Sequence, residues 1–352
     1  MRKVSHLKGI SAKDLWALQR VERKSLTLRP TEAVTPCSIC GAKSAFLVAD
    51  RCRGGERLNT VLCDQCGLVR RDPMPSPEEL QRYYSSSYRV EIGKGKRPSP
   101  RRLCRIMHIA LERALDLVAR LPQNARTLDV GCGAGDLVYL LQSAGFDAHG
   151  FDPDSRYIEW ARSIIGDVVE EHRIEDFHAP SSFDLVTMYH ALEHMPNPGY
   201  TLDRIREWLR HDGLLVIEVP NVEARNQAPG NQYIKPHVHY FNIATLSMLA
   251  AQHGFELEHA GTYATNENVR CYLRKRREAQ GSATNHQANA QKMRALLQGH
   301  KSLSHYATAT PYSRSWAKMC RTVAEHLRTM GKSDREIMSK TAEELRFLTA
   351  RK

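Results

Sequence analysis

A glycine-rich turn constrains the fold of this sequence more than any other feature. Within LDVGCGAG, residues 128–135, Gly131, Gly133 and Gly135 follow a short apolar stretch and precede a segment with helical periodicity. Glycine lets backbone N–H groups approach a ligand without a Cβ clash, and N–H groups at a helix start bind polar ligands. The turn therefore predicts a strand–turn–helix unit that holds a nucleoside-like cofactor. The alternative is a turn that only packs a helix tightly against a strand.

Acidic residues around the turn indicate which cofactor it suits. Counted from Gly131, the third position of the dinucleotide fingerprint G-x-G-x-x-G is Asp136, whose carboxylate would repel a pyrophosphate. Asp129 is equally unsuited to a pyrophosphate, but it suits a ligand that carries an ammonium and a sulfonium group. Asp152 ends the next predicted strand, where a carboxylate can accept hydrogen bonds from both ribose hydroxyls.

From residue 126 onward, apolar strand patterns alternate with helical patterns. This alternation predicts an α/β fold, in which a parallel sheet is covered by helices on both faces. The predicted strands are 127–130, 147–152, 183–189, 213–219 and 255–261, and the first two predicted helices are 134–145 and 155–164.

Four segments carry a family resemblance. LDVGCGAG, GFDPD, FDLVTMYHALEHMPNP and GLLVIEVPN, in this order and spacing, resemble the class I S-adenosylmethionine-dependent methyltransferases over about residues 125–275. The resemblance implies a Rossmann-like, seven-stranded sheet with an antiparallel last hairpin, which residues 255–261 and 268–275 fit. It also implies S-adenosylmethionine contacts at Asp129, Gly131, Cys132, Gly133, Gly135 and Asp152, an adenine-side contact near Asp176 and Phe177, and backbone contacts around Tyr189. Glu175 competes with Asp176 for the adenine side.

Two C-x-x-C-G motifs, at 37–41 and 63–67, predict a metal site. Four thiolates, from Cys37, Cys40, Cys63 and Cys66, can close a tetrahedral zinc site. The segment between them has few large apolar residues, so we expect bound Zn²⁺ to supply its folding energy. A redox dithiol is the alternative for either pair, and Cys52 is not expected to be a ligand.

The combination of the two motifs with the segments that follow adds a second resemblance. The cysteine motifs, the segment 67–89 and the methyltransferase core resemble bacterial methyltransferases with an N-terminal zinc-binding module. These include sugar C-methyltransferases that act on nucleotide-linked deoxysugars, often encoded with enzymes of cell-surface polysaccharide synthesis. The resemblance implies C- or O-methylation of a small-molecule acceptor, such as a sugar nucleotide or a related polysaccharide precursor.

Histidines follow the predicted strands at the carboxyl edge of the sheet, where α/β proteins bind ligands. An acceptor hydroxyl, or a carbon beside a carbonyl, must lose a proton, so His190, His237 and His239 are the catalytic candidates. An extended 237–241 segment would place His237 and His239 on the same side. Structural hydrogen bonding to the sheet edge is the alternative for both.

The segment HALEH (190–194) allows three interpretations. His190, Glu193 and His194 would share one helical face and could ligate a divalent ion. In ubiquinone-pathway O-methyltransferases a similar segment reads E-x-x-E-H and holds such an ion, whereas here His190 replaces the first acid. Alternatively, Glu193 and His194 hydrogen-bond the backbone and fix the loop, or His190 acts directly on cofactor or acceptor.

Charge and hydropathy limit the partners. The net charge is +12, yet residues 127–220 hold 6 basic and 17 acidic residues, while 281–352 hold 13 and 5. Basic flanks make a zinc-containing RNA methyltransferase one alternative, and a non-catalytic methyltransferase-fold interaction protein is another.

No run of about 18 apolar residues predicts a membrane span, and no signal-peptide pattern opens the chain, so a cytoplasmic location is expected. The oligomeric state is not predicted.

The chain divides into five expected parts. They are a basic N-terminal helix (1–34, helical at 11–26), a zinc-binding ribbon (35–72), a helical linker (73–125), the methyltransferase domain (126–280) and a helical basic C-terminal extension (281–352). A capping box at Ser333 and Glu336 predicts a helix start within the extension.

Overall fold

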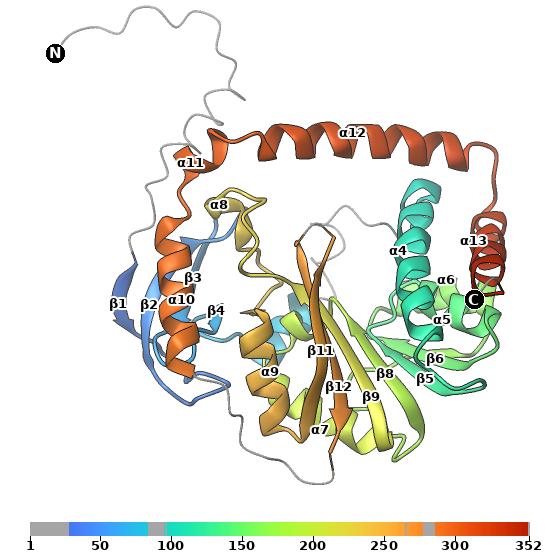
Figure 1. Cartoon of the computed structure of the whole chain (residues 1–352), viewed down its shortest axis with the longest axis horizontal. Helices are drawn as coiled ribbons and strands as arrows, with labels where there is room; N and C mark the ends of the chain where they lie inside the picture. Colours follow the sequence, from blue (N-terminus) through green and yellow to red (C-terminus); the bar gives the residue numbers. More distant parts are fainter. Residues whose placement is uncertain (1–27, 84–94, 96, 265, 277–285, 351–352) are drawn as a thin grey trace, which may run out of the picture.

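The computed structural model describes residues 28–83, 95, 97–264, 266–276 and 286–350. The helix expected at 11–26 lies outside these residues. Two sheets organise the described chain: a seven-stranded sheet, and a five-stranded sheet built mainly from the N-terminal part (Figure 1).

The seven-stranded sheet has the order β11-β12-β9-β8-β5-β6-β7. Its strands are β5 (Arg126–Val130), β6 (Asp147–Asp152), β7 (Val169–Glu171), β8 (Phe183–Tyr189), β9 (Leu209–Pro220), β11 (Phe255–Tyr263) and β12 (Asn268–Lys275). Strands β5 to β9 pair in parallel, and β12 pairs antiparallel with both β9 and β11. The expected seven-stranded sheet with an antiparallel last hairpin is confirmed.

Helices cover both faces of this sheet, each over its own apolar core. One core holds residues of α7 (Pro198–Trp208) and α9 (Ile243–Gln252), and the other holds residues of α4 (Pro100–Val118), α5 (Asp136–Ser143), α6 (Ser155–Ile165) and α13 (Asp334–Thr349). Leu103, Met107 and Leu117 of α4 are fully buried at helical spacing, so the predicted linker helix is part of the second core.

The N-terminal part forms an antiparallel sheet of β1 (Arg29–Glu32), β2 (Ser44–Arg51), β3 (Arg57–Cys63) and β4 (Val69–Arg71). Its fifth strand, β10 (His239–Tyr240), comes from the segment after β9 and pairs with β4. The short α2 (Pro77–Arg82) follows, and the side chain of Ser76 caps its start. The N-terminal sheet thus includes His239, one of the predicted catalytic histidines.

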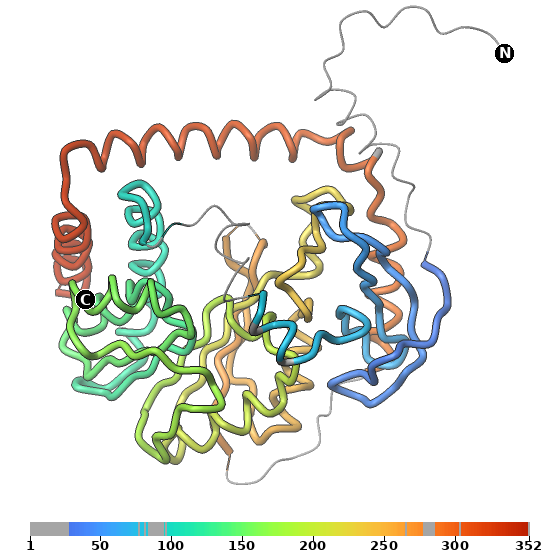
Figure 2. Tube along the Cα trace, turned by 180° about the vertical axis from the view of Figure 1, so that it is seen from behind, coloured from blue at the N-terminus to red at the C-terminus, as the bar shows by residue number. Residues whose placement is uncertain are grey.

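The C-terminal extension spans the molecule. Helix α10 (His286–Gly299) lies against the N-terminal sheet, the short α11 (Ser302–Tyr306) follows, and α12 (Thr310–Thr329) runs across to α4 and α13, as both views show (Figures 1 and 2). The predicted capping box of Ser333 and Glu336 starts α13. No helix of the described residues is long and apolar enough to cross a membrane. The shortest helices are α8 (Pro229–Gln232) and the 3₁₀ turn η2 (Leu192–His194).

Candidate active site

The three glycines after β5 all adopt left-handed backbone conformations, with φ of 77° at Gly131, 55° at Gly133 and 68° at Gly135. A Cβ atom at Gly131 would lie 3.1 Å from the Cβ of Ala191, and one at Gly135 would lie 2.7 Å from Cδ1 of Ile165. At Gly133 such a Cβ would meet no atom of the described residues within 4 Å. Gly131 and Gly135 therefore serve close packing, and Gly133 faces the open space that a ligand needs.

Asp152, at the end of β6, is held against this turn. Its carboxylate accepts hydrogen bonds from the N–H groups of Gly133, at 3.0 Å, and Asp154, at 2.8 Å. These two donors fix the orientation of the carboxylate at the carboxyl edge of the sheet. The placement expected for a ribose-binding acid is therefore present.

Cys132 lies within the turn but is committed to the protein interior. Its N–H donates to the carbonyl of Phe151 at 3.0 Å, and its side chain is buried over Gly150. Burial raises the pKa of the Cys132 thiol well above its usual range, so the thiol stays neutral. The structure gives the Cys132 side chain a packing role, and the cofactor contact expected at this residue stays a prediction.

The surroundings of the turn are acidic. Asp129 is buried and accepts a hydrogen bond from Oγ1 of Thr187 at 2.7 Å. Burial, with smaller contributions from Asp136 and Asp152, raises the pKa of Asp129 to about 7. Burial likewise raises the pKa of Asp136 to about 6. A cation bound here would relieve both shifts, because it favours the ionised carboxylates.

The three remaining residues predicted to contact the cofactor, Tyr189, Phe177 and Asp176, differ in how exposed they are. Tyr189, at the end of β8, is buried, its hydroxyl has no hydrogen-bond partner among the described residues, and the guanidinium carbon of Arg113 lies 4.1 Å from the ring centre. The Phe177 ring stacks on Phe151 at 4.6 Å, so its side chain belongs to the core. Asp176, in the adjoining turn, is exposed.

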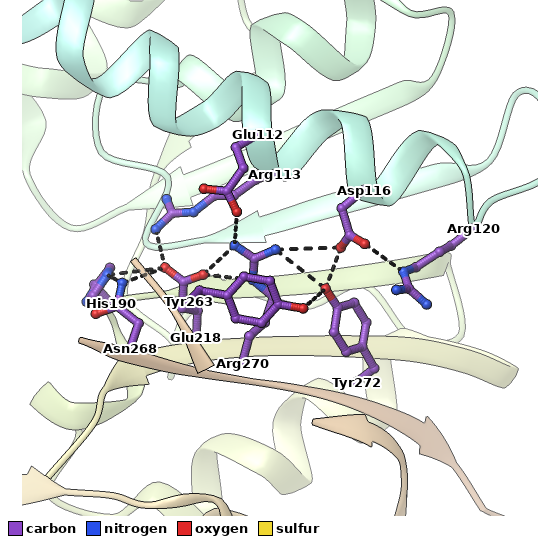
Figure 3. A network of polar contacts seen from close by, with 10 residues as sticks. All are labelled: Glu112, Arg113, Asp116, Arg120, His190, Glu218, Tyr263, Asn268, Arg270 and Tyr272. Carbon is purple, nitrogen blue, oxygen red and sulfur yellow. Dashed lines mark hydrogen bonds and ion pairs between the residues drawn. The ribbon is translucent and has the colours of Figure 1, made fainter. Parts of the chain in front are cut away.

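A buried network of charges lies beside Tyr189 (Figure 3). Glu218 of β9 and Arg270 of β12 are almost fully buried, and Nη2 of Arg270 lies 2.6 Å from Oε2 of Glu218. Nη2 of Arg113 from α4 donates to Glu218 at 2.7 Å, and Nδ2 of Asn268 donates to it at 3.1 Å. Burial disfavours the charge of Glu218, yet these cations and His190 hold the pKa of Glu218 well below its usual range.

The network continues along α4 and ties this helix to the last hairpin. Nη2 of Arg270 donates to Glu112 at 3.1 Å, and its guanidinium carbon lies 3.9 Å from the ring centre of Tyr263. The Tyr272 hydroxyl donates to Asp116 (Figure 3).

This network of buried charges was not predicted. The signal in the sequence was a charged residue among apolar neighbours in a strand, Glu218 in GLLVIEV and Arg270 in VRCYL.

Glu218→Gln is expected to destabilise the fold by about 3 kcal/mol, because removing one partner leaves buried cationic charge without compensation. Chemical denaturation measures the difference. Glu256→Gln is the matched control, since Glu256 of β11 forms a surface ion pair with Arg276 and should leave the free energy of unfolding close to that of the wild type. Equal effects of the two substitutions would show that the buried network does not stabilise the site.

The residues of HALEH (190–194) do not share one helical face, as one interpretation expected, because only 192–194 form a helical turn. His190 lies before η2 with a positive φ of 56°, and its ring sits between Glu193, at 3.5 Å, and Glu218, at 3.4 Å. Although burial opposes the charge, these two carboxylates raise the pKa of His190 to about 9. His190 is therefore a cation at neutral pH and is not a ready proton acceptor.

Glu193 is the centre of a second cluster. Its side chain is fully buried, and neither carboxylate oxygen has a hydrogen-bond partner among the described residues. Nε2 of His194 and Nε2 of His237 each lie 3.9 Å from Oε1 of Glu193. Nδ1 of His194 donates to the carbonyl of Pro236 at 2.9 Å, so the other ring nitrogen, Nε2, is the one on the side of Glu193. The three side chains could hold a metal ion.

His237 and His239 do not share a side, because the chain bends at Val238 before β10 begins. The imidazole of His239 is fully enclosed, with Nδ1 3.1 Å from the carbonyl of Met195 and Nε2 3.1 Å from Oγ of Ser38. The expectation that His239 faces an acceptor is corrected: both of its nitrogens hold structural hydrogen bonds. His237 keeps a partly exposed ring, and burial lowers the pKa of His237 to about 3, so the ring is neutral.

The four predicted cysteine ligands come together. Sγ of Cys37 lies 3.5 Å from that of Cys66, Sγ of Cys40 lies 3.4 Å from that of Cys63, and all four atoms lie within 4.8 Å of one another. These distances are too long for disulfides and suit four ligands around one tetrahedral ion. Cys52 is buried and lies outside the cluster, as expected.

Two segments from later in the chain, α10 and β10, contact the cysteine cluster. A Cβ at Gly67 would lie 2.7 Å from Nδ2 of Asn289, which itself donates to the carbonyl of Cys66 at 2.8 Å. Ser38, in the first cysteine motif, contacts His239 of β10. The cluster is therefore built into the loop that carries His237 and into the C-terminal extension.

Comparison with known proteins agrees with this geometry. Residues 98–260 match the family described as Methyltransferase domain. The ubiquinone biosynthesis O-methyltransferase of Glaesserella parasuis is 29% identical over 114 residues, covering 28% of this chain and 47% of that protein. The tRNA U34 carboxymethyltransferase of Cronobacter sakazakii is 33% identical over 132 residues, covering 34% of this chain and 41% of that protein.

Among solved structures, one similar chain is the 1,6-didemethyltoxoflavin-N1-methyltransferase of Burkholderia thailandensis with bound 1,6-didemethyltoxoflavin and S-adenosylhomocysteine. It has 20% sequence identity and a TM-score of 0.44, and the match covers 60% of this chain and 96% of that one. The chain spans less than half the length of both curated relatives described above.

Proposed function

We propose that the methyltransferase domain at residues 98–260 binds S-adenosylmethionine and transfers its methyl group to a small-molecule acceptor. The observation that carries the proposal is the group of acidic side chains beside the open face of Gly133, which we call the acidic pocket. Asp152 is positioned for the ribose hydroxyls, and the negative charge of Asp129 and Asp136 favours a ligand with ammonium and sulfonium groups. The same charges oppose a dinucleotide, whose pyrophosphate would lie at this turn.

When bound, the cofactor supplies a methyl group already activated on a sulfonium. The residues of the chain then have to align the acceptor, exclude water and accept one proton. Tyr189 and His190 lie at the carboxyl edge beside the pocket, where they border the approach of an acceptor. His190, held cationic between Glu193 and Glu218, suits a negatively charged or carbonyl group of that acceptor.

The proton acceptor in this proposal is His237. Its ring is neutral because burial lowers its pKa to about 3, and the Glu193 carboxylate 3.9 Å away offsets part of this cost when the ring takes a proton. His237→Ala is expected to lower turnover by about 100-fold and to leave the dissociation constant of S-adenosylmethionine unchanged. His211→Ala, at an exposed histidine beside Asp212, is the control and should leave both quantities unchanged.

A divalent ion held by Glu193, His194 and His237 is the second chemistry that fits this cluster. The number of metal ions per chain distinguishes proton acceptance by His237 from metal binding by the cluster. A proton-accepting His237 predicts one metal ion per chain, held by the cysteines, and no change of stoichiometry in Glu193→Gln. Two ions per chain, with one lost in Glu193→Gln, would replace the proton-acceptor role with metal binding. Full turnover in both His237→Ala and Glu193→Gln would remove the cluster from the mechanism.

Zn²⁺ is the metal proposed for Cys37, Cys40, Cys63 and Cys66. Four soft thiolate ligands in a closed, buried set favour zinc in a structural role. The proposed ion would brace the fifth strand of the N-terminal sheet, and through it the loop that carries His237.

The acceptor class proposed is a sugar nucleotide or a related polysaccharide precursor. Its support is the architecture of a cysteine module followed by a methyltransferase core, together with the sheet that joins this module to the acceptor-side loop. The test measures S-adenosylhomocysteine formed with a panel of nucleotide sugars, phenolic quinone precursors and unmodified tRNA. Turnover of a nucleotide sugar alone supports the class, and turnover of a phenol or tRNA alone replaces it.

RNA is the second acceptor class in that panel, because the extension is basic and one curated relative acts on tRNA by name. RNA binding by Lys and Arg contacts would fall steeply as salt rises. If tRNA is not retained at low salt and no panel member is methylated although S-adenosylmethionine binds, the catalytic proposal gives way to a non-catalytic interaction protein.

A further inference from the structure

Helix α12 carries an apolar stripe that no described helix or strand covers. Its members are from half to two-thirds exposed and follow one another at intervals of three or four residues: Tyr312, Trp316, Met319, Val323 and Leu327 of the helix, and Met330, the residue that caps its end. This spacing places them on one face of the helix. In both views α12 forms the outer edge of the molecule (Figures 1 and 2).

The opposite face of α12 holds the helix to the body of the protein. Nη2 of Arg314 lies 3.1 Å from Oε1 of Glu267, and Nε of Arg105 donates to Glu325 at 2.7 Å. With about 100° of rotation per residue, Arg314 and Glu325 lie roughly opposite the apolar stripe. The stripe therefore points away from the methyltransferase domain, and the anchoring contacts fix it there.

Two copies of the stripe can face each other when their helices run in opposite directions. In an antiparallel pairing about a two-fold axis near residue 321, Tyr312 meets Met330 of a second copy, and Trp316 meets Leu327, which lies one residue beyond the position directly opposite. Met319 then meets Val323. An aromatic side chain thus opposes an aliphatic one towards both ends of the stripe and two aliphatic side chains meet at its centre, so the same surface can face itself as an isologous interface requires.

The residues that flank the stripe favour a second copy over a membrane surface. One flank holds Ser313, Cys320 and Ala324, and the other holds Ser315 and His326, so no Lys or Arg borders the apolar face. A membrane-binding helix needs cationic side chains beside its apolar face to reach the headgroups. Neutral flanks instead let two identical helices approach without repulsion between like charges.

The area of the stripe is sufficient for a specific dimer. Six large side chains exposed to this extent offer on the order of 600 Å² per copy, and two copies then reach the ~1,200 Å² at which specific interfaces begin. We infer that two copies of this chain associate through an antiparallel pairing of their α12 helices, with the two-fold axis near residue 321. This inference does not depend on the proposed function.

Complementary charge substitutions test the pairing. Sedimentation of the full-length protein at about 1 to 100 μM is expected to show a dimer, and Trp316→Lys and Leu327→Glu should each weaken it by at least about 100-fold. Mixing the two variants should restore a heterodimer, because Lys at 316 of one copy then faces Glu at 327 of the other. Lys318→Asp, on the anchored face of the same helix, is the control and should remain dimeric.

Cys320 gives an independent readout, since it has the one exposed thiol of the nine cysteines and lies beside the expected axis. A short bis-maleimide should link two wild-type chains but not Cys320→Ser. A wild-type protein that stays monomeric over the concentration range would overturn the inference and leave an intramolecular cover for the stripe. A dimer that survives Trp316→Lys, or variants that fail to pair when mixed, would show that the copies meet through another surface.

Discussion

Asp152→Ala is expected to weaken S-adenosylmethionine binding by at least about 100-fold, the largest loss that any single substitution in the pocket should cause. Two hydrogen bonds from ribose hydroxyls to a carboxylate are each worth about 1.5–3 kcal/mol, and alanine removes both. Isothermal titration measures the dissociation constant. Because Asp152 also accepts the N–H groups of Gly133 and Asp154, the midpoint of thermal unfolding has to be measured alongside.

Two further variants make this result specific. Asp147→Ala removes an exposed aspartate at the other end of β6 and should leave binding unchanged. Asp152→Asn keeps an acceptor oxygen for the backbone N–H groups but removes the charge, and should bind with intermediate affinity. Wild-type affinity in a folded Asp152→Ala protein would contradict the placement of the ribose at β6.

Cys63→Ser is expected to release the metal and unfold the N-terminal sheet. Structural zinc contributes about 10–16 kcal/mol of apparent binding energy to small domains, comparable with or larger than the whole stability of a typical domain. Cys63 is fully buried at the end of β3, so the vacant site cannot be filled by solvent without disrupting the sheet. Native mass spectrometry reports the metal, and limited proteolysis reports the loss of the sheet.

The matched control is Cys52→Ser, which alters a buried cysteine in the turn between β2 and β3 that lies outside the cluster. This variant should keep one zinc ion per chain. A Cys63→Ser protein that lacks metal yet resists proteolysis as well as the control would show that the cysteine cluster does not hold the sheet together.

Much of the seven-stranded sheet was predicted because most of its strands carry apolar runs. Residues 183–189 match β8 at both ends, and residues 147–152 match β6, which begins and ends at an aspartate. Strand β7 was not predicted. It has three residues, lies at the sheet edge, and carries two glutamates, so it has no apolar pattern to recognise.

Contacts between distant segments could not be predicted from local patterns. Pairing of β10 with β4 separates His239 from His237, and only the folded chain shows that one imidazole is enclosed against Ser38 while the other stays beside Glu193. The extension likewise has no motif that indicates contact with the cysteine cluster, yet Asn289 donates to the carbonyl of Cys66.

The cofactor pocket was predicted better than the groups beside it. The three glycines and Asp152 follow a spacing set by one strand, one turn and one helix. The charges that meet at Glu218 instead come from α4, β9 and β12, segments that lie up to 158 residues apart in the chain. Long-range charge pairing of this kind has no spacing rule in a single sequence.

Isothermal titration of the zinc-loaded protein with S-adenosylmethionine tests the central claim most directly. The account predicts saturable binding with one site per chain, in a preparation that native mass spectrometry shows to be folded and to carry bound zinc. Absence of binding heat in that same preparation, at ligand concentrations of about 1 mM, where even weak sites fill, would contradict the assignment of the acidic pocket.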